Sequence, residues 1–171
     1  MDLVKPIIIF TTFWDATSVY ESGGFMIDDK IIKFDPNEVE LRSIALAQPK
    51  GKSLPNLSFL NPTWDILKEY KADRDWQKYT NEYKQILVEN RLEIADWIDS
   101  LENKVYILCC WENTCKGANC HRKIVFDALN SSNRTKSSAL YIYRDGDSNT
   151  YNQEKQIMKM HSFLSEEEVT I

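Results

Sequence analysis

The sequence predicts a single α/β domain spanning residues 1–171, with a mixed, largely parallel sheet flanked by helices in a Rossmann-like arrangement. Two uninterrupted apolar runs, residues 7–12 and 105–110, are typical of central strands that are covered on both faces. Segments with apolar residues at helical spacing separate and follow these runs, and strands that alternate with helices build parallel sheets. The length of 171 residues fits one domain with an ordinary core.

The first sixty residues are predicted to hold strands and connecting turns. Pro6 precedes the first apolar run, Gly23 and Gly24 interrupt any regular pattern, and Asp35-Pro36-Asn37 ends a short apolar segment. The expected elements are a strand over residues 7–12, a site loop over 13–15, an irregular segment over 18–29, an edge strand over 30–34, a strand over 41–47 and a basic turn over 48–52.

The remainder is predicted to be mainly helical around one central strand. Asn61-Pro62 fits the N-cap and first position of a helix, Asp73 fits the N-cap of a longer one, and Asn119 fits the N-cap of a helix that begins at Cys120. The expected elements are helices over 63–71 and 74–100, a strand over 105–110, a helix from 120, a polar loop over 131–138, a strand over 139–143, a polar loop over 144–156 and a final helix or strand over 157–164.

Charge and composition restrict the function classes. The net charge is −5, which disfavours broad nucleic-acid binding driven by charge. No run of the sequence reaches the length of a transmembrane helix, and the apolar run at residues 7–10 is too short for a signal peptide. We therefore expect a cytoplasmic protein without membrane association, in which the thiols stay reduced.

Residues 104–130 concentrate the reactive side chains, because they contain all four cysteines and His121. Cys120, His121 and Arg122 are expected in the first helical turn, where free N–H groups and the helix dipole favour an anion. Arg122 would add a planar fork for a phosphate, and the same position lowers a thiol pKa, which makes Cys120 a candidate nucleophile. Alternatively, Cys120 and His121 share the apolar face with Ile124 and Val125 as core residues. In both cases Arg122 is expected at a pocket rim or in solvent.

Zinc binding by a structural zinc protein is an alternative. Cys110, Cys115 and Cys120 are spaced five residues apart and His121 adjoins the last of them, and thiolate and imidazole are the ligands that zinc prefers. However, no Cys-x-x-Cys pair is present, and the adjacent residues Cys120 and His121 are awkward ligands for one tetrahedral ion. We therefore expect neither a bound metal nor a cofactor.

Other candidate site residues lie in this segment or follow the first strand. Glu112 is the best general base by position, and Asp15 is a second candidate for a base or for a ligand of a ribose hydroxyl. Trp14 is expected either to stack on a nucleobase or to be a core residue. The remaining candidates for ligand contact are Cys110, Tyr79 and Tyr83. The two tyrosines are alternatively core residues. The basic turn of Lys50 and Lys52 is a further candidate for binding a phosphate.

Three ordered blocks of the sequence resemble the family called domain of unknown function 488. The blocks are Ser43-Ile44-Ala45-Leu46, Leu60-Asn61-Pro62 followed by Tyr79 and Tyr83, and Leu108-Cys109 with Trp111-Glu112 and Cys120-His121-Arg122. The resemblance covers about residues 41–143 and implies a compact α/β fold with a polar pocket near the Cys-His-Arg helix. The family often opens with a strand that leads into a Gly-His type turn, whereas this chain has Thr11 to Asp15 at that place.

These observations predict a pocket for a phosphorylated or nucleotide-like small molecule, in a protein that either acts on the molecule as an enzyme or only binds it. The alternative is a non-catalytic module that sequesters a nucleotide or joins a protein complex. A homodimer is compatible with the sequence, which does not define the oligomeric state.

Overall fold

A computed structural model describes residues 6–27, 30–51, 54–111, 119–131 and 140–143 of the chain. Four strands form one parallel sheet in the order β4-β5-β1-β6, where β1 is Ile7–Thr12, β4 is Val39–Ser43, β5 is Val105–Cys110 and β6 is Leu140–Tyr143. Every described pairing in this sheet is parallel. The prediction of an α/β domain is confirmed.

An antiparallel pair lies outside the main sheet. β2, Gly24–Ile27, pairs with β3, Lys30–Lys33, as a separate two-stranded sheet. The described strands of the main sheet all run in one direction, so the mixed pairing that the sequence predicted is not found within them, and β2 and β3 form a sheet of their own. The predicted strand over residues 30–34 is confirmed, but its partner is β2.

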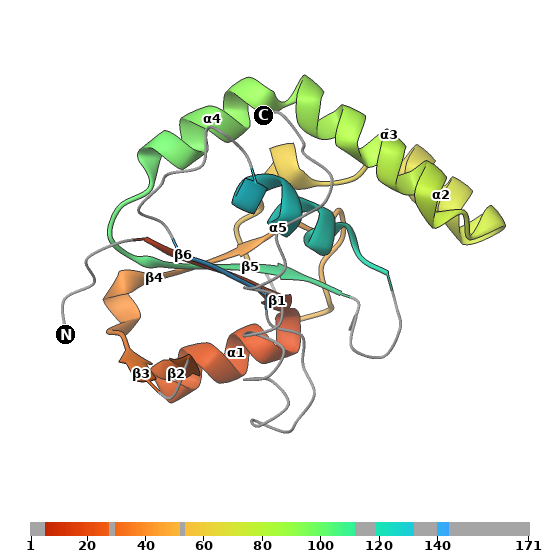
Figure 1. Cartoon of the computed structure of the whole chain (residues 1–171). Coiled ribbons are helices and arrows are strands. Elements are labelled where there is room, and N and C mark those ends of the chain that lie inside the picture. Colours follow the sequence, from red (N-terminus) through yellow and green to blue (C-terminus); the bar gives the residue numbers. More distant parts are fainter. Residues whose placement is uncertain (1–5, 28–29, 52–53, 112–118, 132–139, 144–171) are drawn as a thin grey trace.

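Helices cover both faces of the parallel sheet (Figure 1). On one face lies α1, Phe13–Ser22, and on the other lie α3, Trp76–Glu89, α4, Arg91–Ser100, and α5, His121–Ser131. The α2 helix, Trp64–Asp73, packs along α3 and extends away from the sheet. Two short 3-10 helices, Pro36–Glu38 and Ser58–Leu60, lie in the connections. Among the described helices, none is both long and apolar enough to cross a membrane.

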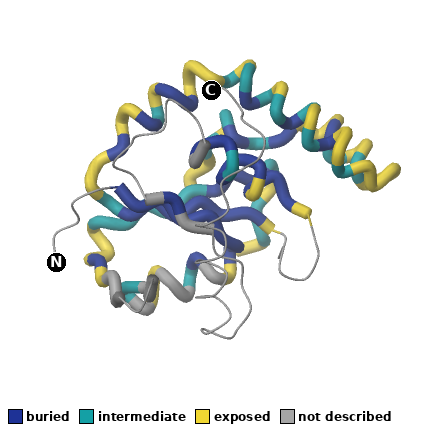
Figure 2. Tube along the Cα trace, in the orientation of Figure 1, coloured by how far each residue is buried: buried dark blue, intermediate teal, exposed yellow. Residues whose placement is uncertain are grey.

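The two central strands form the middle of the hydrophobic core. β1 and β5 are buried at all six positions each, as their uninterrupted apolar runs predict. The α5 helix lies over β1, and its residues Val125, Phe126 and Leu129 are fully buried. The ring of Phe126 meets the ring of Phe10 edge-on at a centroid distance of 5.6 Å. Figure 2 shows the buried residues concentrated in the sheet and in the helix above it.

Two predictions for the N-terminal part are wrong. Residues 13–15 are the start of α1 rather than a loop, because Phe13 and Ala16 supply an apolar face that is buried. Residues 18–27 are not irregular: the helix continues to Ser22, and Gly23 with a φ of 68° turns the chain directly into β2. The glycines therefore mark a sharp connection between two regular elements.

Several helix and strand boundaries also differ from the predictions. The strand predicted over 41–47 lies at Val39–Ser43, because the chain leaves the sheet at Ile44. Thr63, rather than Asn61, caps α2, and its hydroxyl accepts a hydrogen bond from the Ile66 amide. The helix predicted over 74–100 begins only at Trp76, because Arg74 adopts a φ of 56° as the C-cap of α2. It is also divided into α3 and α4 at Asn90.

Asp75, rather than Asp73, provides the N-cap of α3. The predicted strand at 139–143 is confirmed as β6. The predictions for residues 132–138 and 144–164 lie outside the described residues.

We expect Phe126→Ala to lower the free energy of unfolding by roughly 3–5 kcal/mol, because it empties a fully buried position between α5 and β1. Lys123→Ala on the exposed side of the same helix should change the value by less than about 0.5 kcal/mol. Urea denaturation followed by circular dichroism measures both. Equal losses for the two variants would contradict the position of α5 on the sheet.

Candidate functional site

Three segments that are distant in the sequence meet at the carboxyl end of the parallel sheet. Cys110 is the last residue of β5, Cys120 directly precedes α5, and His121 is its first residue. The loop after β4, which begins at Ile44, lies beside them. Ligands of open parallel sheets bind at this edge, so the sheet itself positions the candidate site.

The hydrogen bonds of His121 fix the orientation of its ring. Nε2 lies 2.7 Å from the carbonyl oxygen of Ile44, and because a carbonyl oxygen only accepts, Nε2 carries the proton and donates. In the neutral ring, Nδ1 therefore presents its lone pair, at 3.7 Å from the Cys110 Sγ and 3.8 Å from the Cys120 Sγ. The Tyr83 ring packs against the imidazole edge-on at 5.2 Å. A buried imidazole thus faces two buried thiols.

The N-terminal end of α5 brings the Cys120 and His121 side chains together, although adjacent residues within a helix point in different directions. Because α5 begins at His121, Cys120 and not Asn119 stands directly before the helix, and the Asn119 side-chain amide donates to the Tyr70 hydroxyl. Cys120 lies one position before the helix, and its carbonyl accepts a hydrogen bond from the Lys123 amide. Because Cys120 precedes the helical turn, its Sγ lies on the same side as the His121 Nδ1. Their adjacency in the sequence therefore does not keep the two ligand atoms apart, since Sγ and Nδ1 are 3.8 Å from each other.

Arg122 is fully buried, with 0 % of its surface exposed, and the prediction that it points to a pocket rim or solvent is wrong. Arg122 was expected at the third position of a helix that begins at Cys120, beside the apolar stripe; α5 begins at His121, and Arg122 is its second residue. Burial raises the pKa of the Cys120 thiol, but the hydrogen bond with Cys110, the positive charge of Arg122 and the neighbouring His121 outweigh it. The net pKa of Cys120 lies well below its usual value. Arg122 thus acts on the cluster from inside the protein.

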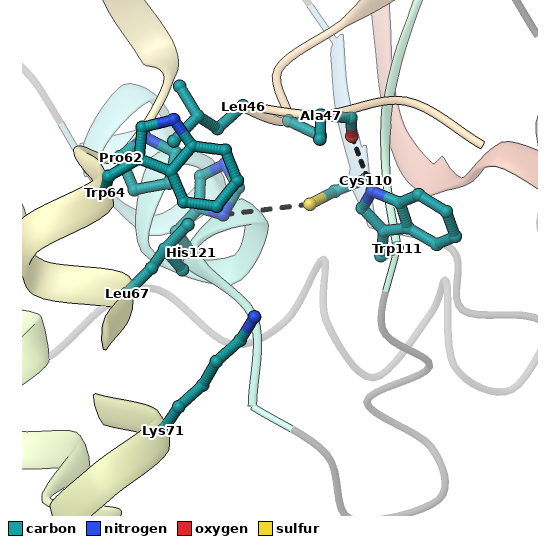
Figure 3. Close-up of a pocket in the computed structure, with 10 residues that line it drawn as sticks. Leu46, Ala47, Pro62, Trp64, Leu67, Lys71, Cys110, Trp111 and His121 are labelled. Carbon is teal, nitrogen blue, oxygen red and sulfur yellow. Dashed lines mark hydrogen bonds between the residues drawn. The ribbon is translucent and has the colours of Figure 1, made fainter. Parts of the chain in front are cut away.

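A cavity of about 340 Å³ opens beside this cluster (Figure 3). Cys110 and His121 form part of its lining, while Trp64 and Trp111 lie on opposite sides of it and Lys71 points its amine toward it. The Trp111 indole is held in place because its Nε1 donates to the Ala47 carbonyl at 2.6 Å. The ten lining residues are Ala45, Leu46, Ala47, Pro62, Trp64, Leu67, Lys71, Cys110, Trp111 and His121.

The aromatic candidates lie around the cavity rather than in it. Trp14 is 54 % exposed and contacts the Trp111 ring edge-on at 5.9 Å, so it supports the cavity wall from outside. Tyr79 and Tyr83 are buried and stack on each other at 6.2 Å. The Tyr83 hydroxyl donates to the Leu60 carbonyl, and burial raises its pKa well above the usual value. Both tyrosines therefore occupy the core.

The remaining candidates are not part of the described cluster. Glu112, Cys115 and Lys52 lie outside the described residues, as does the side chain of Asp15, which belongs to α1. Lys50 is exposed in the turn after β4 and is not among the lining residues.

Sequence reasoning missed the cavity walls. Trp64 and Lys71 lie on α2, seven positions apart and therefore on one side of the helix, and this spacing of an aromatic and a basic residue is a signal that could have been found. Trp111 appeared in the sequence analysis only as part of a block that resembles a known family, without a role in a cavity wall. Pro62, Leu67 and residues 45–47 carry no signal that distinguishes them from ordinary core and turn residues.

The cluster supports two kinds of chemistry. An imidazole lone pair beside a thiol can accept its proton and generate a thiolate nucleophile. Two thiols and an imidazole nitrogen are also the ligands of a soft or borderline metal ion. In both cases Cys110 and His121 offer their reactive atoms next to the cavity.

Comparison with protein-family models, curated proteins and solved structures found no match. The resemblance to the family called domain of unknown function 488 therefore stays a prediction.

We expect Arg122→Ala to lower the free energy of unfolding by at least about 2 kcal/mol, because it removes a fully buried side chain and a positive charge next to Cys120. Thermal melting measures this, with Lys123→Ala as the matched control on the exposed side of α5.

Arg122→Met separates the two causes, since it retains most of the volume without the charge. A melting temperature close to that of the native chain would assign the loss to packing, and a loss as large as that of Arg122→Ala would assign it to charge. An Arg122→Ala variant as stable as the Lys123→Ala control would contradict the burial of this residue.

Proposed function

We propose that the protein binds a small molecule with a flat apolar body and an anionic end, of the nucleotide or sugar-phosphate class, in the cavity beside Cys110 and His121. The single observation that carries the proposal is the composition of the cavity wall: two indoles face the cavity from opposite sides, and a lysine amine points toward it. A cavity of about 340 Å³ is within the range of small-molecule sites.

The walls favour a flat apolar group. Trp64 lies on α2 and is 53 % exposed, while Trp111 follows β5 and is 38 % exposed. Large exposed indoles are costly to leave in water, and stacking of a nucleobase on an aromatic side chain contributes about 1–3 kcal/mol. Leu46, Pro62 and Leu67 extend the apolar surface between them. A nucleobase or another aromatic ring matches this lining.

The charges favour an anion. Lys71 is the single formally charged group among the ten lining residues, and none of them is acidic. The amine projects toward the cavity from α2 and is placed to donate to a phosphate or carboxylate. Arg122, which the sequence suggested as the anion ligand, is buried behind the cluster, so Lys71 replaces it in this role.

The same cavity serves either an enzyme or a binding module. Cys110 and His121 lie where a bound molecule would meet a thiol and an imidazole, which favours a reaction on that molecule. A molecule that copurifies with the native protein and is recovered intact after prolonged incubation would favour the non-catalytic alternative. Its identity by mass spectrometry would define the ligand class directly.

We expect Lys71→Ala to weaken the binding of adenosine monophosphate at least tenfold, since a charged hydrogen bond contributes about 1.5–3 kcal/mol. Calorimetric titration measures the affinity, with adenosine and ribose 5-phosphate as the two halves of the probe. The intact nucleotide should bind more tightly than either half, because only the nucleotide uses both the indoles and the amine.

Lys68→Ala is the matched control, because Lys68 is exposed on the same helix and does not line the cavity. Trp64→Ala should weaken adenosine binding but leave the melting temperature nearly unchanged, since more than half of the side chain is exposed. Equal effects of Lys68→Ala and Lys71→Ala, or no measurable binding of any of the three probes, would contradict the proposal.

A further inference from the structure

We infer that Cys110, Cys120 and His121 form a zinc site whose fourth coordination position is open to the cavity. The inference does not depend on which small molecule the cavity binds. It rests on three features: the distances within the cluster, the second hydrogen bond of the imidazole, and the position of the cluster at the cavity wall.

The distances fit one tetrahedral ion. The two Sγ atoms and the His121 Nδ1 all lie within 4.8 Å of one another, and the imidazole nitrogen is 3.7 and 3.8 Å from the two sulfurs. With Zn–S near 2.3 Å and Zn–N near 2.0–2.1 Å, the S···N edge of a tetrahedron is about 3.6 Å. The two S···N distances therefore need to change by only a few tenths of an ångström. The two sulfurs, which lie within 4.8 Å of each other, would move to the S···S edge of about 3.8 Å by rotation of the cysteine side chains.

The imidazole is oriented as metal-bound histidines are. Metal-binding histidines nearly always donate their other ring N–H to a carbonyl or carboxylate, which fixes the tautomer and the ring plane. Here Nε2 donates to the Ile44 carbonyl at 2.7 Å, and the Tyr83 ring holds the imidazole from the side. The lone pair on Nδ1 is therefore directed between the two thiols before any ion is bound.

Among residues 6–27, 30–51, 54–111, 119–131 and 140–143, the cluster supplies three ligands and faces a cavity. Zinc sites with three protein ligands keep their fourth position for water or substrate, whereas purely structural sites are closed by four protein ligands. Cys110 and His121 belong to the cavity lining, and Cys120 lies behind them. The fourth position of an ion held by these three residues is consequently accessible to a molecule in the cavity.

The charge balance favours an anion at this position. Binding of Zn²⁺ releases the two thiol protons to solvent, and two thiolates with a neutral imidazole cancel the charge of the ion. The buried Arg122 and the Lys71 amine then leave positive charge around the site. A hydroxide, or the anionic end of a bound molecule, would neutralise this charge.

The first test is the metal content of the full-length chain purified under reducing conditions. We expect about one zinc per chain by elemental analysis, lost in Cys110→Ala, Cys120→Ala and His121→Ala. Cys109→Ala is the matched control, because Cys109 precedes Cys110 on the same strand, is equally buried and lies on the opposite face of the sheet. Zinc should be retained in this variant.

Cobalt substitution of the native chain keeps the test valid if a variant does not fold. Titration of the metal-free protein with Co²⁺ should give the intense visible bands of tetrahedral coordination together with thiolate charge-transfer absorption for two sulfurs. Addition of azide should change the visible bands, because the fourth position is open.

Three results would overturn the inference. The first is a metal-free protein that gives no tetrahedral cobalt spectrum. The second is zinc retained in both Cys110→Ala and Cys120→Ala, which would locate the ion elsewhere. The third is a cobalt spectrum that azide leaves unchanged, which would indicate a closed site. These results do not test the proposal of nucleotide binding through Lys71, because the metal is measured without any nucleotide.

Discussion

The hydrogen bond from the His121 Nε2 to the Ile44 carbonyl is the interaction on which the site depends. It joins the first residue of α5 to the point where the chain leaves β4, and it does so beside the end of β5. This bond fixes which ring nitrogen faces the thiols and also anchors the loop that contributes residues 45–47 to the cavity. One polar contact therefore orients the reactive imidazole and positions one wall of the cavity.

The sequence predicted the parts of the fold that follow from hydrophobic patterning. The uninterrupted runs of β1 and β5 have no polar face, so both strands had to be central, and the structure confirms their bounds. The place of the site followed as well, because the cysteines and His121 cluster where a central strand ends and a helix begins. The N-cap residues were less predictable, since Asn61, Thr63, Asp73 and Asp75 are all good caps and tertiary packing selects among them.

The details of the site depend on contacts between segments far apart in the sequence. Arg122 was expected at a pocket rim or in solvent because Cys120 and His121 occupy the apolar stripe, but its side chain is fully buried while the next residue, Lys123, is exposed. The pairing of adjacent Cys120 and His121 could not be foreseen, because it requires Cys120 to precede the helix. The cavity walls from α2 and from the loop after β4 meet only in the folded chain.

The distance along the sequence between Ile44 and His121 is 77 residues, and this has a consequence for how the protein folds. β4 and β5 pair in parallel, so α2, α3 and α4 must all be accommodated in the connection before the two strands can meet. Such non-local pairing makes folding slow, because a long loop must close before its contacts compensate the lost chain entropy. On the ribosome, Ile44 emerges long before its histidine partner is synthesised. The contact between the Ile44 carbonyl and the His121 ring can therefore form only after the chain has been synthesised beyond α4 and β5.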